Sequence, residues 1–178
     1  RLSIAIEKAS GEYLLYVDSD DYEAVYDSLY SIYKTGKETG AEYIKSDQAW
    51  AWDDTFYQND IHFSDMPNKL IPIKNYPEDI IKRQYHNIGF GGLHNDAICA
   101  PLLKKVFEEI KDIWKNSKVK LFGFTDVAIS TAAALKANTL YYLPKYTYYY
   151  DNRSRKDPKR LTWEDKNLLS DQFAHLVY

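Results

Sequence analysis

The chain has 178 residues, of which 45% are hydrophobic and 28% are charged, the proportions of a globular domain with a real core. Its formal net charge of −3 argues against a general nucleic-acid binder, which would be basic. Cys99 is the only cysteine, which excludes an intrachain disulfide and a cysteine-based zinc cluster and fits a reducing, cytoplasmic setting.

The first residues predict a helix that leads into a short strand. Residues 1–10 have the pattern of the last turns of a helix, and Gly11 stands near its C-terminal end. Residues 13–17, Tyr-Leu-Leu-Tyr-Val, are apolar or aromatic and favour a short buried strand. A doubly wound domain normally has strands before such a helix, so we expect the chain to be a fragment of a longer protein.

Polarity reverses directly after this strand, where carboxylates gather at Asp18, Asp20 and Asp21. Ligands of open α/β sheets bind outside the carboxyl ends of the strands. Clustered carboxylates repel one another unless a cation or a basic ligand compensates them. The cluster therefore predicts a Mg²⁺ or Mn²⁺ site with oxygen ligands and room for a phosphate.

The stretch from Arg1 to Asp21 resembles the middle of a family-2 glycosyltransferase with the GT-A fold. In that family a helix leads into Ala-x-Gly-Glu-Tyr, a strand, and an Asp-x-Asp motif whose divalent ion bridges the diphosphate of a nucleotide sugar. The resemblance implies a donor site at Asp18, Ser19 and Asp20, with Asp18 near the ribose and metal and Asp20 as a direct metal ligand. Earlier strands of the family, which hold the base and uridine, are not in this sequence. The chain departs from the family at Leu2, Ser3 and Ala5, where Arg, Asn and Gly are usual.

The acidic cluster has three other interpretations. An acidic strand end can simply be a solvated turn that caps the next helix. A calcium-binding EF-hand loop fails on spacing, because Glu23 and Leu29 stand where Gly and Glu are needed. A phosphatase of the haloacid dehalogenase kind is weakly supported, because Tyr22 occupies the place of its Thr.

Residues 22–40 predict a helix that buries Val25, Leu29 and Ile32 at i, i+4 and i+7. A stripe of tyrosines runs alongside this face and is interpreted as core or groove lining: Tyr22, Tyr26, Tyr30 and Tyr33. Residues 42–46 predict a short strand.

Residues 47–76 mix aromatic and acidic side chains with Pro-marked turns, and residues 78–85 predict a helix. In the resembled family this region varies with the acceptor, so we expect an acceptor-side hairpin or flap and an acceptor side over residues 47–136. His94 is the one histidine kept as a substrate contact, with a structural histidine as the alternative. A short strand then precedes an amphipathic core helix over residues 102–114.

The segment from Phe122 to Val127 resembles the Glu-Asp motif at the start of the family's helix beneath the acceptor. Thr125 replaces the usual Glu and is assigned to the acceptor site. Asp126 is retained and would be the general base that takes a proton from the acceptor hydroxyl. The alternative is that either residue only caps the helix over residues 127–136.

The end of the chain predicts two strands, residues 139–143 and 146–150, separated by Pro144. The following basic loop resembles a segment that closes over the donor, where Arg153, Arg155 and Lys156 would neutralise the diphosphate. A solvated loop is the alternative.

Together these patterns predict an α/β fold: a GT-A-like, Rossmann-related mixed sheet flanked by helices over residues 1–160, and an amphipathic helix over residues 161–178. The implied activity is inverting transfer from a nucleotide-diphosphate sugar, a UDP-sugar by resemblance, to a glycan or lipid-linked acceptor in bacterial surface polysaccharide synthesis. A non-catalytic carbohydrate- or partner-binding module remains open, as does peripheral association with the inner face of the membrane.

Overall fold

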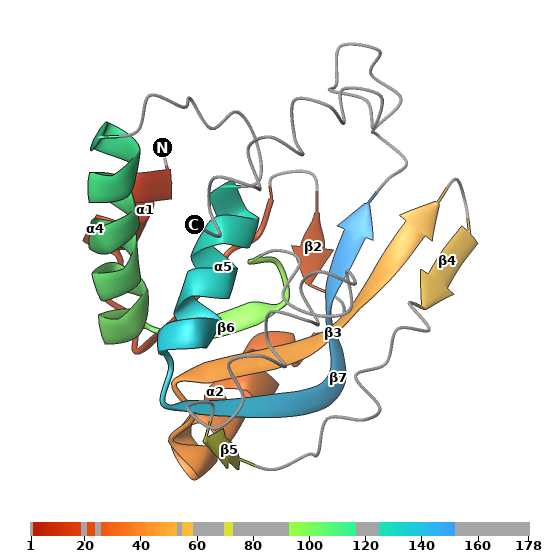
Figure 1. Ribbon diagram of the computed structural model, residues 1–178. Helices are drawn as coiled ribbons and strands as arrows, with labels where there is room; N and C mark the ends of the chain where they lie inside the picture. Colours follow the sequence, from red (N-terminus) through yellow and green to blue (C-terminus); the bar gives the residue numbers. More distant parts are fainter. Residues whose placement is uncertain are drawn as a thin grey trace, which may run out of the picture.

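The fold is a mixed sheet with helices on both faces (Figure 1). The computed structural model describes residues 2–18, 21–23, 26–52, 55–58, 70–72, 93–116 and 125–151. The described strands are β1 (Tyr13–Leu15), β2 (Tyr22–Glu23), β3 (Tyr43–Trp52), β4 (Thr55–Gln58), β5 (Leu70–Pro72), β6 (Asp96–Cys99) and β7 (Thr139–Asp151). The described helices are α1 (Leu2–Lys8), α2 (Ser28–Thr39), α4 (Ala100–Asn116) and α5 (Thr125–Lys136).

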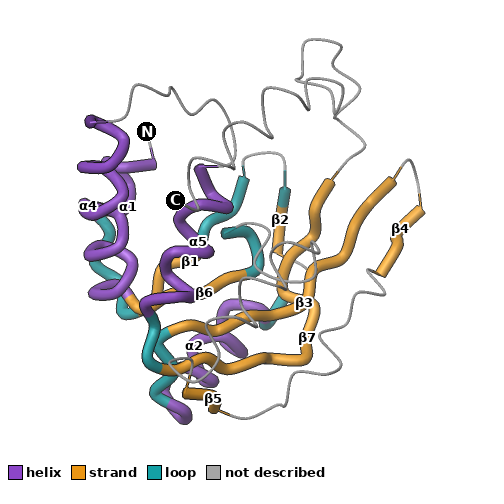
Figure 2. The backbone as a smooth tube through the Cα atoms, in the orientation of Figure 1, coloured by secondary structure: helices purple, strands orange, loops and turns teal. Residues whose placement is uncertain are grey.

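The strand order is β1-β6-β3-β7-β2, with β4 beside β3 and β5 beside β7 (Figure 2). Among the described pairs, β3 and β7 run parallel and the others run antiparallel. The parallel strands β3 and β7 thus come from opposite halves of the chain. The predicted α/β class and mixed sheet flanked by helices are confirmed.

Side chains along each strand point alternately to the two faces of the sheet, and apolar side chains on both faces pack against helices. Tyr43, Ile98 and Leu140 belong to the core cluster formed with α1, α4 and α5. Their neighbours Ile44, Ala97 and Tyr141 belong to or pack against the cluster of α2. Because successive strand residues point to opposite faces, one sheet contributes side chains to two apolar layers.

The predicted break at Pro144 is wrong, because β7 is one strand from Thr139 to Asp151. Its pairing with β3 shifts register on either side of Asp47, so that Ser46 faces Leu143 and Asp47 faces Tyr146. Such an irregularity lets a strand accommodate a proline without ending.

The helix predicted over residues 22–40 begins later than expected. Tyr22 instead starts β2, which pairs with β7, and α2 begins at Ser28. The buried residues of α2 are Ser28, Ile32 and Gly36, whereas Leu29 is 56% exposed. The described tyrosines of the predicted stripe are exposed rather than buried: Tyr26, Tyr30 and Tyr33.

Gly36 explains which face of α2 is buried, because a Cβ at this position would lie 2.5 Å from Cε2 of Tyr13. The Tyr13 hydroxyl passes α2 and donates a hydrogen bond to the carbonyl oxygen of Ala41, at 2.5 Å. Only a residue without a side chain lets the ring of β1 lie this close to the helix.

Other predicted elements agree with the structure. The core helix is α4, which buries Leu102, Leu103 and Val106, and the antiparallel pair β3–β4 forms a hairpin in the region where a hairpin or flap is predicted. Its place on the acceptor side stays a prediction. The helices predicted over residues 78–85 and 161–178 lie outside the described residues. Within the described part of the chain, no helix has the length and apolar character needed to span a membrane.

Candidate functional site

The predicted acidic cluster lies where the chain passes from β1 to β2. The backbone N–H of Asp21 donates to the carbonyl oxygen of Asp18 at 3.1 Å, which closes a turn after β1. Pairing of Tyr22 with Tyr149 then holds the following strand against β7. The side chain of Asp18 is 30% exposed, whereas Asp21 is only 9% exposed as a residue.

Tyr148 of β7 holds both acids in place. Its hydroxyl donates to Oδ2 of Asp21 at 2.6 Å and accepts the backbone N–H of Asp18 at 3.3 Å. The other carboxylate oxygen of Asp21, Oδ1, accepts the backbone N–H of Asp151 at 2.7 Å. Burial, and then the hydrogen bond to Asp21, raise the pKa of Tyr148 well above its ordinary value. The hydroxyl therefore stays protonated and remains a donor to the acid.

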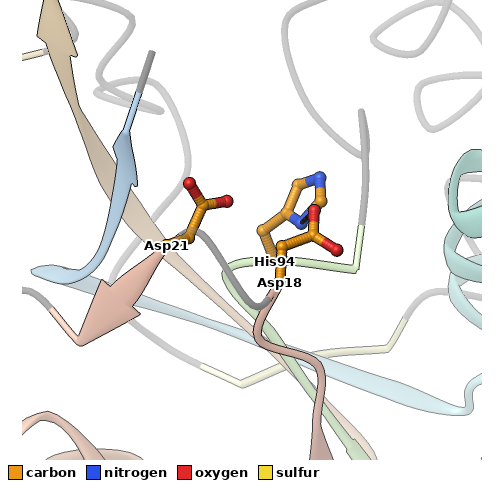
Figure 3. A group of neighbouring side chains, drawn as sticks. All are labelled: Asp18, Asp21 and His94. Carbon is orange, nitrogen blue, oxygen red and sulfur yellow. Dashed lines mark ion pairs between the residues drawn. The ribbon is translucent and has the colours of Figure 1, made fainter. Parts of the chain in front are cut away.

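His94 lies between two carboxylates that come from opposite sides of the site. Its Nδ1 is 3.6 Å from Oδ2 of Asp18, and its Nε2 is 3.4 Å from Oδ2 of Asp126. Figure 3 shows the imidazole beside Asp18, with Asp21 next to them. The imidazole thus links the acids after β1 to the first turn of α5, where Asp126 is favoured by the helix dipole.

Aromatic rings surround this histidine. The ring centroids of Tyr16, Tyr148 and Tyr150 lie 6.1, 5.4 and 5.8 Å from that of His94. Its side chain is 14% exposed, while those of Asp18 and Asp126 are 30% and 28% exposed. The two carboxylates are therefore accessible to a bound molecule, whereas the imidazole between them is nearly buried.

Asp18, Asp21 and His94 together fit a divalent metal ion. One ligand atom from each lies within 4.8 Å of the others. Nδ1 of His94 is buried and makes no hydrogen bond to any described residue, which leaves its lone pair available. A set of two carboxylates and an imidazole suits Mn²⁺ better than Mg²⁺, because Mg²⁺ prefers oxygen ligands alone.

The structure brings together three of the residues proposed from sequence: Asp18, His94 and Asp126. His94, expected only as an acceptor contact, lies near Asp18, which is predicted for the donor site, as well as near Asp126, which is predicted as the base. Thr125 is the first residue of α5. Five predicted site residues lie outside the described part of the chain: Ser19, Asp20, Arg153, Arg155 and Lys156.

Two residues of the site were missed. Asp21 is predicted only as one member of the metal-binding acidic cluster, and Tyr148 only as part of a strand that leads into the basic loop; neither has a predicted role of its own. The run Tyr148-Tyr149-Tyr150 ending in Asp151 was a usable signal, because a strand of tyrosines that meets acids offers hydroxyl donors to them. Its partner strand, however, is not visible in the sequence.

No protein-family model matches the chain, and no curated protein matches it. Several solved structures do match the chain. The chain superimposes on S. aureus TarS 1–349 in complex with UDP-GlcNAc with a TM-score of 0.64 and 20% identity. That match covers 98% of this chain and 45% of TarS 1–349.

The fold is shared with TarS. The complex of TarS 1–349 with UDP matches with a TM-score of 0.60 and 19% identity, over 98% of this chain and 43% of that one. TarS crystallised without a named ligand matches with a TM-score of 0.59 and 20% identity, over 84% of this chain and 23% of that one. The chain spans less than half the length of these structures.

Proposed function

We propose that this chain is the metal- and acceptor-binding part of an inverting GT-A glycosyltransferase that resembles family 2 and uses a UDP-sugar. One observation carries the proposal: the His94 imidazole joins Asp18, on the donor side, to Asp126, on the acceptor side. Support comes from the fold shared with TarS, which was crystallised with UDP-GlcNAc and with UDP.

On this proposal Asp18 and Asp20 bind Mn²⁺ or Mg²⁺, and His94 and Asp21 complete the set. When bound, the ion supplies positive charge where the diphosphate leaving group gains negative charge. Tyr148 orients Asp21 through its hydrogen bond of 2.6 Å, as hydrogen bonds to metal-ligating carboxylates commonly do. Arg153, Arg155 and Lys156 are proposed as further cations for the diphosphate.

Asp126 is the proposed general base. Its carboxylate lies 3.4 Å from Nε2 of His94 and its side chain is 28% exposed, so an acceptor hydroxyl can approach it. It takes the hydroxyl proton as the oxygen attacks the anomeric carbon and the bond to the diphosphate breaks. With Nδ1 of His94 binding the metal ion, its ring proton is on Nε2, which faces the Asp126 carboxylate and helps to orient it. Thr125 would contact the acceptor, a glycan or lipid-linked sugar of a bacterial surface polysaccharide.

A binding module without turnover is the second candidate. It is favoured by Thr125, which stands where the resembled family has the Glu of its Glu-Asp motif. Binding of a UDP-sugar without release of UDP would support this candidate.

The test is calorimetric titration of UDP with and without Mn²⁺ on the chain, on Asp18→Asn and on Asp112→Asn. Asp112 is an exposed acid on α4 and serves as the matched control. We expect Mn²⁺-dependent binding that weakens about 10-fold or more in Asp18→Asn, the loss typical of a changed metal site. The control should bind like the unchanged chain. Equal UDP affinity with and without Mn²⁺, or in Asp18→Asn and the control, would contradict the metal site.

A further inference from the structure

A row of buried polar residues lies in β3, behind the proposed site. Lys45, Ser46 and Asp47 are 1%, 1% and 6% exposed. Burying polar and charged groups costs free energy unless each finds a partner, so three in succession in a central strand need an explanation. Their partners lie in the turn that carries His94 and in β7.

The first set of contacts ties β3 to β6. The Lys45 ammonium donates to Oδ1 of Asp96 at 2.6 Å, and the Tyr43 hydroxyl donates to Oδ2 of the same residue. Burial raises the pKa of the Asp96 carboxyl, while the Lys45 ammonium and the Tyr43 hydroxyl oppose that rise. The pair is costly to bury, which makes it a weak source of stability but a rigid anchor.

Asn95, the residue after His94, connects to this anchor through its side-chain amide and its backbone carbonyl oxygen. Its Oδ1 accepts from the Lys45 ammonium at 2.9 Å, and its Nδ2 donates to the carbonyl oxygen of Ser46. Its own carbonyl oxygen accepts the N–H of Ser46 at 3.0 Å and the Ser46 hydroxyl at 2.9 Å. Asn95 is 6% exposed, so these bonds form in a low-dielectric interior.

The polar contacts that the described residues make with the His94 ring are, by contrast, long. Its nitrogens lie 3.6 and 3.4 Å from the two carboxylates, and Nδ1 has no hydrogen-bond partner among the described residues. The direction of the imidazole must therefore come from its backbone and from the packing of the surrounding tyrosine rings.

We propose that Asn95 is a positioning residue, which holds His94 between Asp18 and Asp126 through its buried contacts with Lys45 and Ser46. This inference rests on the proposed function in that Asp126 is taken as the base. Ser46 extends the effect to β7, because its hydroxyl lies 2.5 Å from that of Thr147, the neighbour of Tyr148. The same strand thus sets the spacing between His94 and the tyrosine that holds Asp21.

The test compares Asn95→Leu, which keeps the branching at Cγ but cannot hydrogen-bond, and Asn95→Ser, which removes the amide, with the control Asn138→Leu at an exposed position. Asn138 also makes a buttressing contact, since its Nδ2 donates to both oxygens of Glu42 at 3.0 and 3.1 Å, but it lies away from the site. Lys45 keeps Asp96 as its partner in both Asn95 variants, so we expect them to fold.

The first measurement is independent of activity. The rate at which diethyl pyrocarbonate modifies His94 is followed by fragment-ion mass spectrometry on folded, metal-free protein. We expect the rate to rise severalfold in both Asn95 variants and to stay unchanged in Asn138→Leu. An unchanged rate in the Asn95 variants overturns the inference, even if the chain proves to have no transferase activity.

The second measurement is release of UDP from UDP-GlcNAc in the presence of Mn²⁺. We expect Asn95→Leu to lower kcat about 10- to 100-fold with little change in KM, the cost of misplacing a group near the reacting atoms. In a His94→Gln background the same change should have no further effect on kcat, because its action passes through His94. An undiminished effect in that background overturns the inference. Mn²⁺-dependent UDP binding without any UDP release from the unchanged chain instead refutes catalysis by this chain and supports the binding module.

Discussion

Replacing Tyr148 by Phe removes one hydroxyl and leaves the ring in place. The side chain is buried, and its hydroxyl both donates to Asp21 at 2.6 Å and accepts the N–H of Asp18 at 3.3 Å. A hydrogen bond to a charged group contributes about 1.5–3 kcal/mol, so we expect Tyr148→Phe to lower the free energy of unfolding by about 2 kcal/mol at pH 7.

The difference in the free energy of unfolding between the unchanged chain and Tyr148→Phe should become smaller at alkaline pH. The pKa of Tyr148 is raised in the native state, chiefly by burial, whereas an unfolded tyrosine ionises near pH 10. Above that pH the unfolded state binds fewer protons than the native state, so stability falls as pH rises. At pH 11 ionisation of this tyrosine in the unfolded state lowers the free energy of unfolding of the unchanged chain by about 1.4 kcal/mol. Tyr148→Phe has no hydroxyl there to ionise, so it does not lose this stability. The expected difference is then about 0.6 kcal/mol at pH 11.

Urea unfolding followed by circular dichroism at pH 7, 10 and 11 measures these differences. Tyr30→Phe is the matched control, because Tyr30 is 64% exposed on α2 and should change stability by less than about 0.5 kcal/mol. The other buried tyrosines are common to all three proteins and cancel in the comparison. A Tyr148→Phe difference that stays constant from pH 7 to pH 11, or that equals the control, would refute the role of this hydroxyl.

Two further substitutions test the proposed base, Asp126, and the packing of α2 against β1 at Gly36. Asp126→Asn should lower the rate of UDP release from UDP-GlcNAc by about 10²- to 10⁴-fold, because a general base is lost, while calorimetric UDP affinity stays unchanged. A parallel loss of UDP binding would show that Asp126 does not act as a separate base. Gly36→Ala should lower stability by about 1–3 kcal/mol in urea unfolding, because the added Cβ would lie 2.5 Å from the Tyr13 ring. Unchanged stability would mean that Tyr13 moves away freely.

Local patterns predicted much of the secondary structure. The amphipathic stripe of residues 102–114 identified α4, and the apolar run of residues 13–17 located β1, which ends at Leu15, two residues earlier than predicted. These features depend on residues close in sequence, whose spacing alone decides which face is apolar. The errors fell where a distant strand competes with local preference. Tyr22 fits the helical spacing, but pairing with Tyr149 places it in β2.

Which residues lie together in the candidate site also depended on the tertiary structure. Sequence alone selected Asp18 and Asp126 as candidate site acids and kept His94 as a candidate contact. Only the folded chain places His94 between them and sets Tyr148 against Asp21, a residue 127 positions away. The physical reason is that the order of strands in a sheet is set by long-range pairing and burial, which leave little trace in a local pattern. The sequence therefore determined which groups were available, and the pairing of β2 with β7 and of β3 with β6 decided which of them meet.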